Sequence, residues 1–292
     1  MNELISIQRR LSDYNCKSAR EEDQALREIL QDLILAALGR TEFFCKAAFH
    51  GGTHLRIFHG LKRFSEDLDF ALKEDDADFA FTPYLDKVKA ELASFGVKVE
   101  VVDKSKADST VKKAFLKDDS IIRILNLRFV NNIGSRQTPR KLRIKLEVDS
   151  LPPAGATYES LSLSFPFPSS VTAFDLPSAF SGKMHALLCR EYVKGRDWYD
   201  FIWYCGARIP LNHALLSAAI EQNGPWTGQH VRTSDKWVRD ELRKTISRLD
   251  WQKAREDVEP FIHETELASL QYFNAEYFMQ LADRLVQAQN VR

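Results

Sequence analysis

The chain has 292 residues, of which 44% are hydrophobic and 28% are charged, a balance typical of a soluble globular protein with one large or two medium domains. Lys plus Arg and Asp plus Glu both number 41, so the net charge does not indicate a nucleic-acid binder and any basic surface must be local. The sequence has no run of 18 apolar residues and no signal-peptide pattern at its start, so we expect neither a membrane-spanning nor a secreted protein.

Cysteine usage also indicates a chain that is not secreted. The four cysteines have no spacing typical of metal ligands, and three of them lie in apolar surroundings typical of buried thiols. They are Cys16, Cys45, Cys189 and Cys205, of which Cys16 is the exception. We therefore expect a reduced, cytoplasmic chain.

The first strong element is a helix. Ser18 to Glu21 has the capping-box pattern, and apolar residues then recur at helical spacing from Leu26 to Leu38. This long helix leads into a run of aromatic and apolar residues, Phe43 to Phe49, which predicts a buried strand.

The predicted strand ends at Gly51 and Gly52, which allow a tight turn and a close approach of the backbone. The Thr53 hydroxyl can cap the short helix that carries residues 55–58. Because the first N–H groups of a helix have no partner within the helix, its N-terminus is a natural phosphate cradle.

A second strand follows, in which Asp67 and Asp69 share one face while Leu68 and Phe70 point into the core. Carboxylates two residues apart on a strand are separated by roughly 6.6 Å, which suits a pair of divalent metal ions. A phosphate cradle beside a metal clamp implies phosphoryl chemistry on a nucleotide. Taken singly, the glycine pair is typical of a simple turn and the two aspartates of a solvated strand face.

The next segments alternate between helix and strand. An acidic start at Asp75 predicts a helix that runs to about Phe95. Four strands are then expected, with a turn at residues 131–134. They span residues 97–102, 111–116, 121–130 and 142–148. This meander would extend the two earlier strands into a mixed sheet with helices on one side, which is an α+β fold.

Two proline-containing connections, residues 151–155 and 165–168, separate this region from a helical one. We expect a domain boundary near them, with an N-terminal domain at 1–168 and a helical domain at 169–292. Helices are predicted at residues 176–192, 197–206, 210–223, 233–248 and 275–289.

Further charged residues could complete a site. Glu147 and Asp149 lie on one face of the strand at 142–148, where one of them could be a third metal ligand or both could belong to an exposed charged face. On the helix at 176–192, Lys183 and Arg190 share a face with small alanines, which leaves room for a triphosphate. Asp197 begins the following helix and by itself is typical of a residue that complements the helix dipole.

These motifs resemble a known family. A Gly-Gly pair followed by Asp-x-Asp resembles the signature of the polymerase-β-like nucleotidyltransferase superfamily, although the thirteen residues between Thr53 and Asp67 exceed its commonest spacing. The run GGTHLRIFHGLKRFSEDLDF is similar to the first motif of the AbiEii/AbiGii toxins of type IV toxin–antitoxin and abortive-infection systems. The resemblance extends over roughly residues 40–72 and 140–206.

The resemblance implies a nucleotidyltransferase fold and transfer of a nucleoside monophosphate from an NTP to a tRNA 3′ end, another RNA or a protein hydroxyl. It also implies Mg²⁺ or Mn²⁺ as cofactor, a cognate antitoxin as partner and a helical domain that contributes to the nucleotide pocket. The implied metal ligands are Asp67, Asp69 and Glu147, with Asp149 as the alternative to Glu147. The implied nucleotide contacts are Gly51, Gly52, Thr53, Ser65, Lys183 and Arg190, and Asp197 joins the metal ligands and Lys183 in the catalytic set.

Two other function classes stay open: a non-catalytic module of the same fold that binds RNA or an antitoxin, and a metal-dependent nuclease that uses the same carboxylates. His50, His54 and His59 cluster in the sequence, but no cysteine or carboxylate spacing around them predicts a zinc site. Aromatic residues within 198–204 could stack on a base but are more typical of core. Basic residues at 104–117, 136–145 and 232–253 could follow a phosphodiester backbone or be solvated faces.

Overall fold

The computed structural model describes residues 2–103, 120–129 and 141–287. The chain forms two compact units. Unit 1 comprises Met1–His59, Ser65–Pro152 and Glu159–Ala173, and unit 2 comprises Gly60–Phe64, Pro153–Tyr158 and Phe174–Arg292. None of the helices in the described part of the chain has the length and apolar character needed to cross a bilayer.

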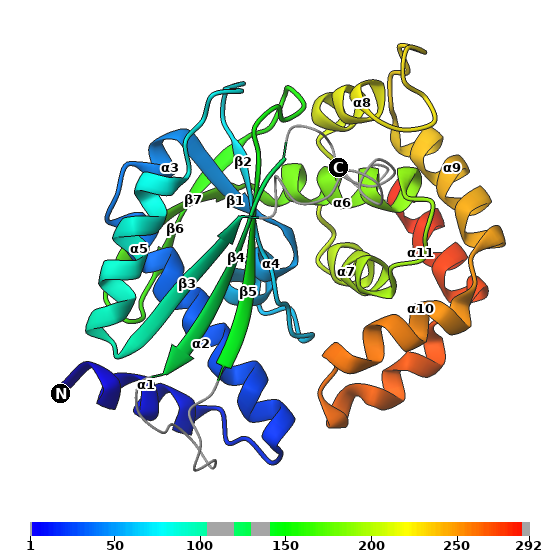
Figure 1. The fold of residues 1–292 in the computed structure, drawn as a ribbon. Coiled ribbons are helices and arrows are strands. Elements are labelled where there is room, and N and C mark those ends of the chain that lie inside the picture. The colour runs from blue at the N-terminus through cyan, green and yellow to red at the C-terminus, as the bar shows by residue number, and fades with distance from the viewer. Residues whose placement is uncertain (1, 104–119, 130–140, 288–292) are drawn as a thin grey trace. The chain divides into compact units, whose positions relative to one another are not determined.

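Unit 1 is built around a seven-stranded mixed sheet with the strand order β3-β4-β5-β2-β1-β7-β6 (Figure 1). Its strands are β1 Ala47–His50, β2 Leu68–Leu72, β3 Val97–Asp103, β4 Ser120–Phe129, β5 Lys141–Asp149, β6 Tyr158–Leu163 and β7 Ser169–Phe174. Its helices are α1 Asn2–Asp13, α2 Ala19–Gly39, α3 Phe43–Lys46, α4 Gly51–His59 and α5 Thr82–Ser94. The expected α+β fold with a mixed sheet is confirmed.

Helix α2 forms much of the core of unit 1. It begins where the sequence predicts, with the Ser18 side chain accepting a hydrogen bond from the Glu21 N–H at 3.2 Å. Residues 29–38 are all buried, and α2 packs against α5 and β5. Because side chains alternate along a strand, Leu68 and Phe70 face this core while Asp69 lies on the opposite face of β2.

Two predicted boundaries in unit 1 are wrong. Phe43–Lys46 forms the short helix α3, so the strand is confined to Ala47–His50. The helical turn buries Phe43, whose ring packs edge-on against Phe70 at a centroid distance of 5.0 Å, and a strand would have sent alternate side chains to the other face. Helix α5 begins at Thr82 with Pro83 in its first turn, the position proline favours, and Asp75 lies in the preceding loop.

The strand predictions differ in outcome. Strands β3, β4 and β5 form the expected antiparallel meander. The strand expected at 111–116 and the turn at 131–134 lie outside the described residues. Strands β6 and β7 were not predicted. In β6, Tyr158–Leu163, serines alternate with leucines and only one of the six residues is buried, so the strand has no strong apolar pattern. Strand β1 joins β7 in parallel and β2 in antiparallel orientation.

Unit 2 is helical, as expected. Its elements are α6 Leu176–Cys189, α7 Gly195–Gly206, α8 His213–Gln222, α9 Asp235–Arg248, α10 Trp251–Val258, η2 Glu259–Phe261, η3 Glu264–Tyr272 and α11 Ala275–Gln287. The predicted helices match α6 to α9 and α11, and α10 was missed. The ring of Phe278 of α11 stacks on that of Trp251 of α10 at a centroid distance of 4.4 Å and packs edge-on against Trp198 of α7 at 5.2 Å. Trp251 of α10 therefore packs with the aromatic core of unit 2.

Candidate active site

The glycine pair lies where β1 turns directly into α4. Gly51 is the first residue of α4 and has φ +85°, a conformation that residues with a side chain rarely adopt. A Cβ atom at Gly51 would overlap Oδ2 of Asp69 and lie 3.2 Å from its Cβ. The absence of a side chain at Gly51 therefore lets the Asp69 carboxylate lie against the first turn of the helix.

Thr53 does not cap α4 as predicted, and its predicted nucleotide contact stays a prediction. It lies inside α4 rather than at its cap, it is fully buried, and its hydroxyl donates a hydrogen bond to the main-chain carbonyl of Asp67. The helix needs no side-chain cap at Thr53 because it starts at Gly51. This bond joins the helix to the segment that enters β2, so Thr53 holds Asp67 in position.

Strand pairing brings two of the predicted carboxylates side by side. Strands β2 and β5 are parallel, with Asp69 directly opposite Glu147, and His50 of β1 is opposite Asp69 on the other side. Along β5 the apolar residues are buried and the charged ones are not, which confirms the predicted alternation. The chain places Asp69 between Gly51 and Glu147.

A lysine accompanies these acids. Lys145 forms an ion pair with Glu147. Burial lowers the pKa of Lys145, but the ion pair with Glu147 and the nearby charges of Asp67 and Asp69 outweigh this effect and raise the pKa. Lys145 thus interacts with all three carboxylates, and its ammonium group supplies a positive charge among them. From the sequence alone, Lys145 had no assigned role.

The two candidates for the third carboxylate make different contacts. Asp149 Oδ1 accepts a hydrogen bond from the Leu151 N–H at 3.2 Å, so its carboxylate supports the turn after β5. Glu147 instead lies opposite Asp69. This arrangement favours Glu147 as the third acid.

Ser65 precedes β2 and is held through its main chain. Its carbonyl accepts a hydrogen bond from Gln31 Nε2 at 3.1 Å, and Gln31 is a fully buried residue of α2. This bond anchors the segment between α4 and Asp67. The proposed contact between Ser65 and a nucleotide stays a prediction.

The other predicted residues gather in unit 2, around a buried ion network. Lys183 of α6 lies between two carboxylates of α7, with Nζ 2.7 Å from Asp197 Oδ1 and 2.9 Å from Asp200 Oδ2. Asp200 also receives two hydrogen bonds from Arg63, and Arg190 lies 3.3 Å from Asp197. Three cations thus surround two carboxylates.

Charge pairing favours the ionised forms of Asp197 and Lys183. Burial raises the pKa of Asp197, but Lys183, Lys194 and Arg190 act in the opposite direction and hold it well below its ordinary value. Burial lowers the pKa of Lys183, and Asp197 with Asp200 reverses that effect and raises it. Asp200, which is fully buried, balances Arg63 and Lys183 together.

Arg63 is the residue of this network that sequence reasoning missed. It lies within the GGTHLRIFHGLKRFSEDLDF run, but it is 137 residues from Asp200 in the chain. No local periodicity relates two positions so far apart. Arg63 and Asp200 became recognisable as a pair only through the fold.

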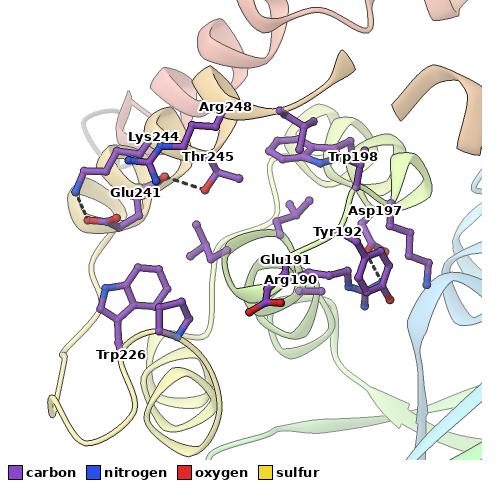
Figure 2. Close-up of a pocket in the computed structure, with 17 residues that line it drawn as sticks. Arg190, Glu191, Tyr192, Asp197, Trp198, Trp226, Glu241, Lys244, Thr245 and Arg248 are labelled. Atoms are coloured by element: carbon purple, nitrogen blue, oxygen red, sulfur yellow. Dashed lines mark hydrogen bonds and ion pairs between the residues drawn. The ribbon is translucent and has the colours of Figure 1, made fainter. Parts of the chain in front are cut away.

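A cavity of about 420 Å³ opens in unit 2 beside Arg190 and Asp197 (Figure 2). Cations and aromatic rings line much of it, together with Asp197, Glu191 and Glu241. The cations and rings include Arg190, Lys194, Lys244, Arg248, Tyr192 and Trp226. Apolar residues, among them Leu187 and Leu249, complete the lining, and the four cations exceed the three carboxylates by one. A cavity of this size lies within the range of small-molecule sites.

Of the three clustered histidines, His54 is fully buried. Burial, with smaller contributions from His59 and His50, lowers the pKa of His54 to about 3. Its ring is therefore neutral at physiological pH.

Comparison with known proteins agrees with these features. The family model described as "Nucleotidyl transferase AbiEii toxin, Type IV TA system" matches residues 33–283. No curated protein matches the chain.

Similar folds occur among solved structures. JHP933 from Helicobacter pylori has a TM-score of 0.54 at 15% identity, with 91% of this chain and 94% of that chain covered. A proposed nucleotidyltransferase from H. pylori has a TM-score of 0.53 at 16% identity, with 91% and 96% covered. MenT4, a nucleotidyltransferase toxin from Mycobacterium tuberculosis, has a TM-score of 0.46 at 17% identity, with 94% and 98% covered. The two H. pylori structures show that the fold is shared.

Proposed function

Since the chain belongs to the AbiEii family of nucleotidyl transferase toxins of type IV toxin–antitoxin systems, we propose that it transfers a nucleoside monophosphate from an NTP to an acceptor hydroxyl. The bond between the α-phosphorus and the β-phosphate breaks, a new ester bond forms to the acceptor oxygen, and pyrophosphate leaves. The observation that carries the proposal is the position of Asp69, opposite Glu147 on β5 and against Gly51 at the start of α4.

The donor set suits a hard divalent cation. Asp67, Asp69 and Glu147 offer carboxylate oxygens, the ligands that Mg²⁺ and Mn²⁺ prefer. These three carboxylates already favour a positive charge near them, since together they raise the pKa of Lys145. When bound there, Mg²⁺ would neutralise the triphosphate and favour ionisation of the acceptor hydroxyl.

The remaining roles in unit 1 belong to the protein itself. The N–H groups of the first turn of α4, starting at Gly51 and Gly52, bind phosphate oxygens as a helix N-terminus does. Thr53 holds Asp67 through its carbonyl. Lys145 forms an ion pair with Glu147 and so balances the charge of that carboxylate. Ser65 is assigned a phosphate contact.

In unit 2 we assign phosphate binding to Lys183 and Arg190. Their support is the charge balance of the network, where Arg63, Lys183 and Arg190 exceed Asp197 and Asp200 by one positive charge. Asp197 orients Lys183 through the 2.7 Å contact. In this proposal residues 1–168 carry the catalytic acids and residues 169–292 contribute to nucleotide binding.

The proposed acceptor is RNA, with the 3′ end of tRNA first and a protein hydroxyl second. The proposed setting is the cytoplasm, where NTP, Mg²⁺ and RNA meet. A cognate antitoxin is the expected partner, as in other type IV systems.

The test is incubation of the purified chain with each labelled NTP, Mg²⁺ and total cellular RNA, followed by identification of what becomes labelled. Asp69→Asn and the double variant Asp67→Asn/Asp69→Asn should incorporate no label. Asp75→Asn, a change of an exposed acid in the same unit, should behave as wild type. Label transfer by the double variant would overturn the mechanism.

The same reactions separate the other two classes. NTP binding without transfer to any RNA or protein would identify a non-catalytic module. RNA fragments that appear with Mg²⁺ and without NTP would identify a nuclease.

A further inference from the structure

Unit 1 contains a second group of side chains that could bind a metal ion. Its chemistry differs from that of the predicted carboxylates. His54 and His59 of α4 and Glu159 of β6 each offer one ligand atom, and these atoms all lie within 4.8 Å of one another. Among residues 2–103, 120–129 and 141–287, no other His, Cys, Asp and Glu side chains make a group of three this close. Sequence spacing supplied two histidines, and the fold adds a carboxylate a hundred residues later.

The distance between the two rings fits a shared ion. The Nε2 atoms of His54 and His59 are 3.1 Å apart. A tetrahedral ion with Zn–N bonds of 2.0–2.1 Å would hold two such nitrogens about 3.3 Å apart. A hydrogen bond between the two rings would also give this distance, so the distance needs support from the surroundings.

The surroundings of His54 supply that support. Its side chain is fully buried, and its Nδ1 atom is buried without a hydrogen-bond partner. The ring also contacts Phe49 and Phe58 at centroid distances of 5.9 and 6.2 Å. The nitrogen of His54 that faces His59 is Nε2, so an ion would bind Nε2 and Nδ1 would stay unpaired. Burial of a polar ring costs free energy, and a metal–nitrogen bond at Nε2 would offset more of that cost than the single hydrogen bond to His59 does.

We propose that His54, His59 and Glu159 bind one transition-metal ion of the zinc class. Two imidazole nitrogens and one carboxylate select Zn²⁺, Co²⁺ or Ni²⁺ over Mg²⁺, because Mg²⁺ prefers oxygen ligands. The site is thus distinct in ion preference from the carboxylates of Asp67, Asp69 and Glu147. It does not depend on the proposed transferase activity.

Such an ion would act on a specific part of the fold. His59 is the last residue of α4, the helix whose first residues are the glycine pair, and Glu159 lies on the strand at the end of the sheet order. Metal binding would therefore join the end of α4 to β6. We expect the ion to stabilise unit 1 against unfolding, since a ligand that binds only the folded state raises its stability.

The experiment uses the full chain with Cys45→Ser as background, because the exposed thiol of Cys45 is a competing soft ligand. After removal of metal with a chelator, Zn²⁺ affinity and stoichiometry are measured by competition with a chromogenic chelator. Co²⁺ is added separately, and its visible absorption reports the coordination geometry. The melting temperature is recorded with and without Zn²⁺.

We expect one Zn²⁺ per chain, undisturbed by excess Mg²⁺. His59→Ala and Glu159→Gln alter half-buried side chains, and each should weaken Zn²⁺ binding at least about 10-fold, a loss that is typical even for residues that only hydrogen-bond to a metal ligand. Each should also reduce the zinc-induced rise in melting temperature. Circular dichroism verifies that both variants fold.

Two controls separate this site from others. His230→Ala removes an exposed histidine that pairs with Glu221 at 3.4 Å and should leave Zn²⁺ binding unchanged. Asp67→Asn/Asp69→Asn should also retain it. Failure of the background protein to take up Zn²⁺ at micromolar concentration would overturn the proposal. So would a Zn²⁺ affinity in both His59→Ala and Glu159→Gln equal to that of the background protein, which would identify the three side chains as a hydrogen-bonded group.

Discussion

Arg63 and Asp200 form a buried, two-point ion pair, with Nε 2.6 Å from Oδ1 and Nη2 2.7 Å from Oδ2. The side chain of Arg63 is 4% exposed and that of Asp200 is not exposed at all. Two parallel hydrogen bonds of this kind match the planar guanidinium group, which lysine cannot reproduce.

Removal of Asp200 should therefore destabilise unit 2. Asp200→Ala leaves Arg63 buried without its directly paired carboxylate, and we expect a loss of about 3–5 kcal/mol in the free energy of unfolding. The double variant Arg63→Met/Asp200→Leu should lose less, because it removes both buried charges. The measurement is urea unfolding followed by tryptophan fluorescence, which reports unit 2 because all five tryptophans lie in it.

An exposed ion pair of unit 2 provides the matched control. Arg243 and Asp283 are 2.9 Å apart but about half exposed, so Asp283→Ala should cost less than about 1 kcal/mol. Equal losses in Asp200→Ala and Asp283→Ala would show that burial does not govern the Arg63–Asp200 pair.

Gly51→Ala should disturb the proposed active site directly. An added Cβ would overlap Asp69 Oδ2 and force the carboxylate away from α4. A displacement of about 1 Å can lower a rate on the order of 100-fold, so we expect at least such a fall in NMP transfer. Gly60→Ala is the control, because Gly60 also has positive φ, +71°, but a Cβ there meets nothing within 4 Å.

Both glycine variants carry the same backbone strain of about 1–2 kcal/mol. Only Gly51→Ala should lose activity beyond its loss of stability. If both variants retain wild-type transfer when folded, the position of the Asp69 carboxylate against α4 is not needed for the reaction.

Gly195 lets two helices of unit 2 approach closely. A Cβ at Gly195 would overlap the main-chain carbonyl oxygen of Ala254, so Gly195→Ala requires α7 and α10 to separate. We expect a loss of about 1–3 kcal/mol or more, as for overpacked cores, measured by tryptophan fluorescence in urea. Gly182→Ala, in α6 with nothing within 4 Å of a new Cβ, should instead raise stability by about 0.5–1 kcal/mol.

Asp32 should make the stability of unit 1 depend on pH. Burial, with a smaller contribution from Glu28, raises its pKa from 3.8 to about 7 against the opposing effect of Arg10. The folded state then binds more protons than the unfolded state between these values, so the free energy of unfolding decreases as pH rises from about 4 through 7. Each pKa unit corresponds to about 1.4 kcal/mol, which limits the effect to roughly 4 kcal/mol.

Asp32→Asn should remove this dependence and raise stability at pH 8 but not at pH 4. Thermal unfolding is followed by far-UV circular dichroism, with tryptophan fluorescence as a separate reporter of unit 2. Asp13→Asn, an exposed change in α1, is the control. An unchanged pH profile in Asp32→Asn would show that Asp32 is ionised in the folded protein at neutral pH.

Much of the fold follows from local patterns. The Ser18 cap, the alternation along β5 and the helices of unit 2 involve residues two to four positions apart, and interactions at that range are visible in the sequence. Phe43 to Lys46 was misassigned because a short apolar run has no clear period. Its helical turn is decided by the aromatic cluster around Phe43, which includes Phe70 and Phe81.

The sequence by itself determined the chemical groups of the candidate site: the glycine pair, the Asp-x-Asp acids, and the cations on the later helices. Only the tertiary structure decided which groups meet. It placed Glu147 opposite Asp69, Arg63 on Asp200 and Glu159 beside His54. The physical reason is that strand order and helix packing relate residues far apart in the chain, and the free energy that selects those pairings comes from burial of the whole core rather than from any local pattern.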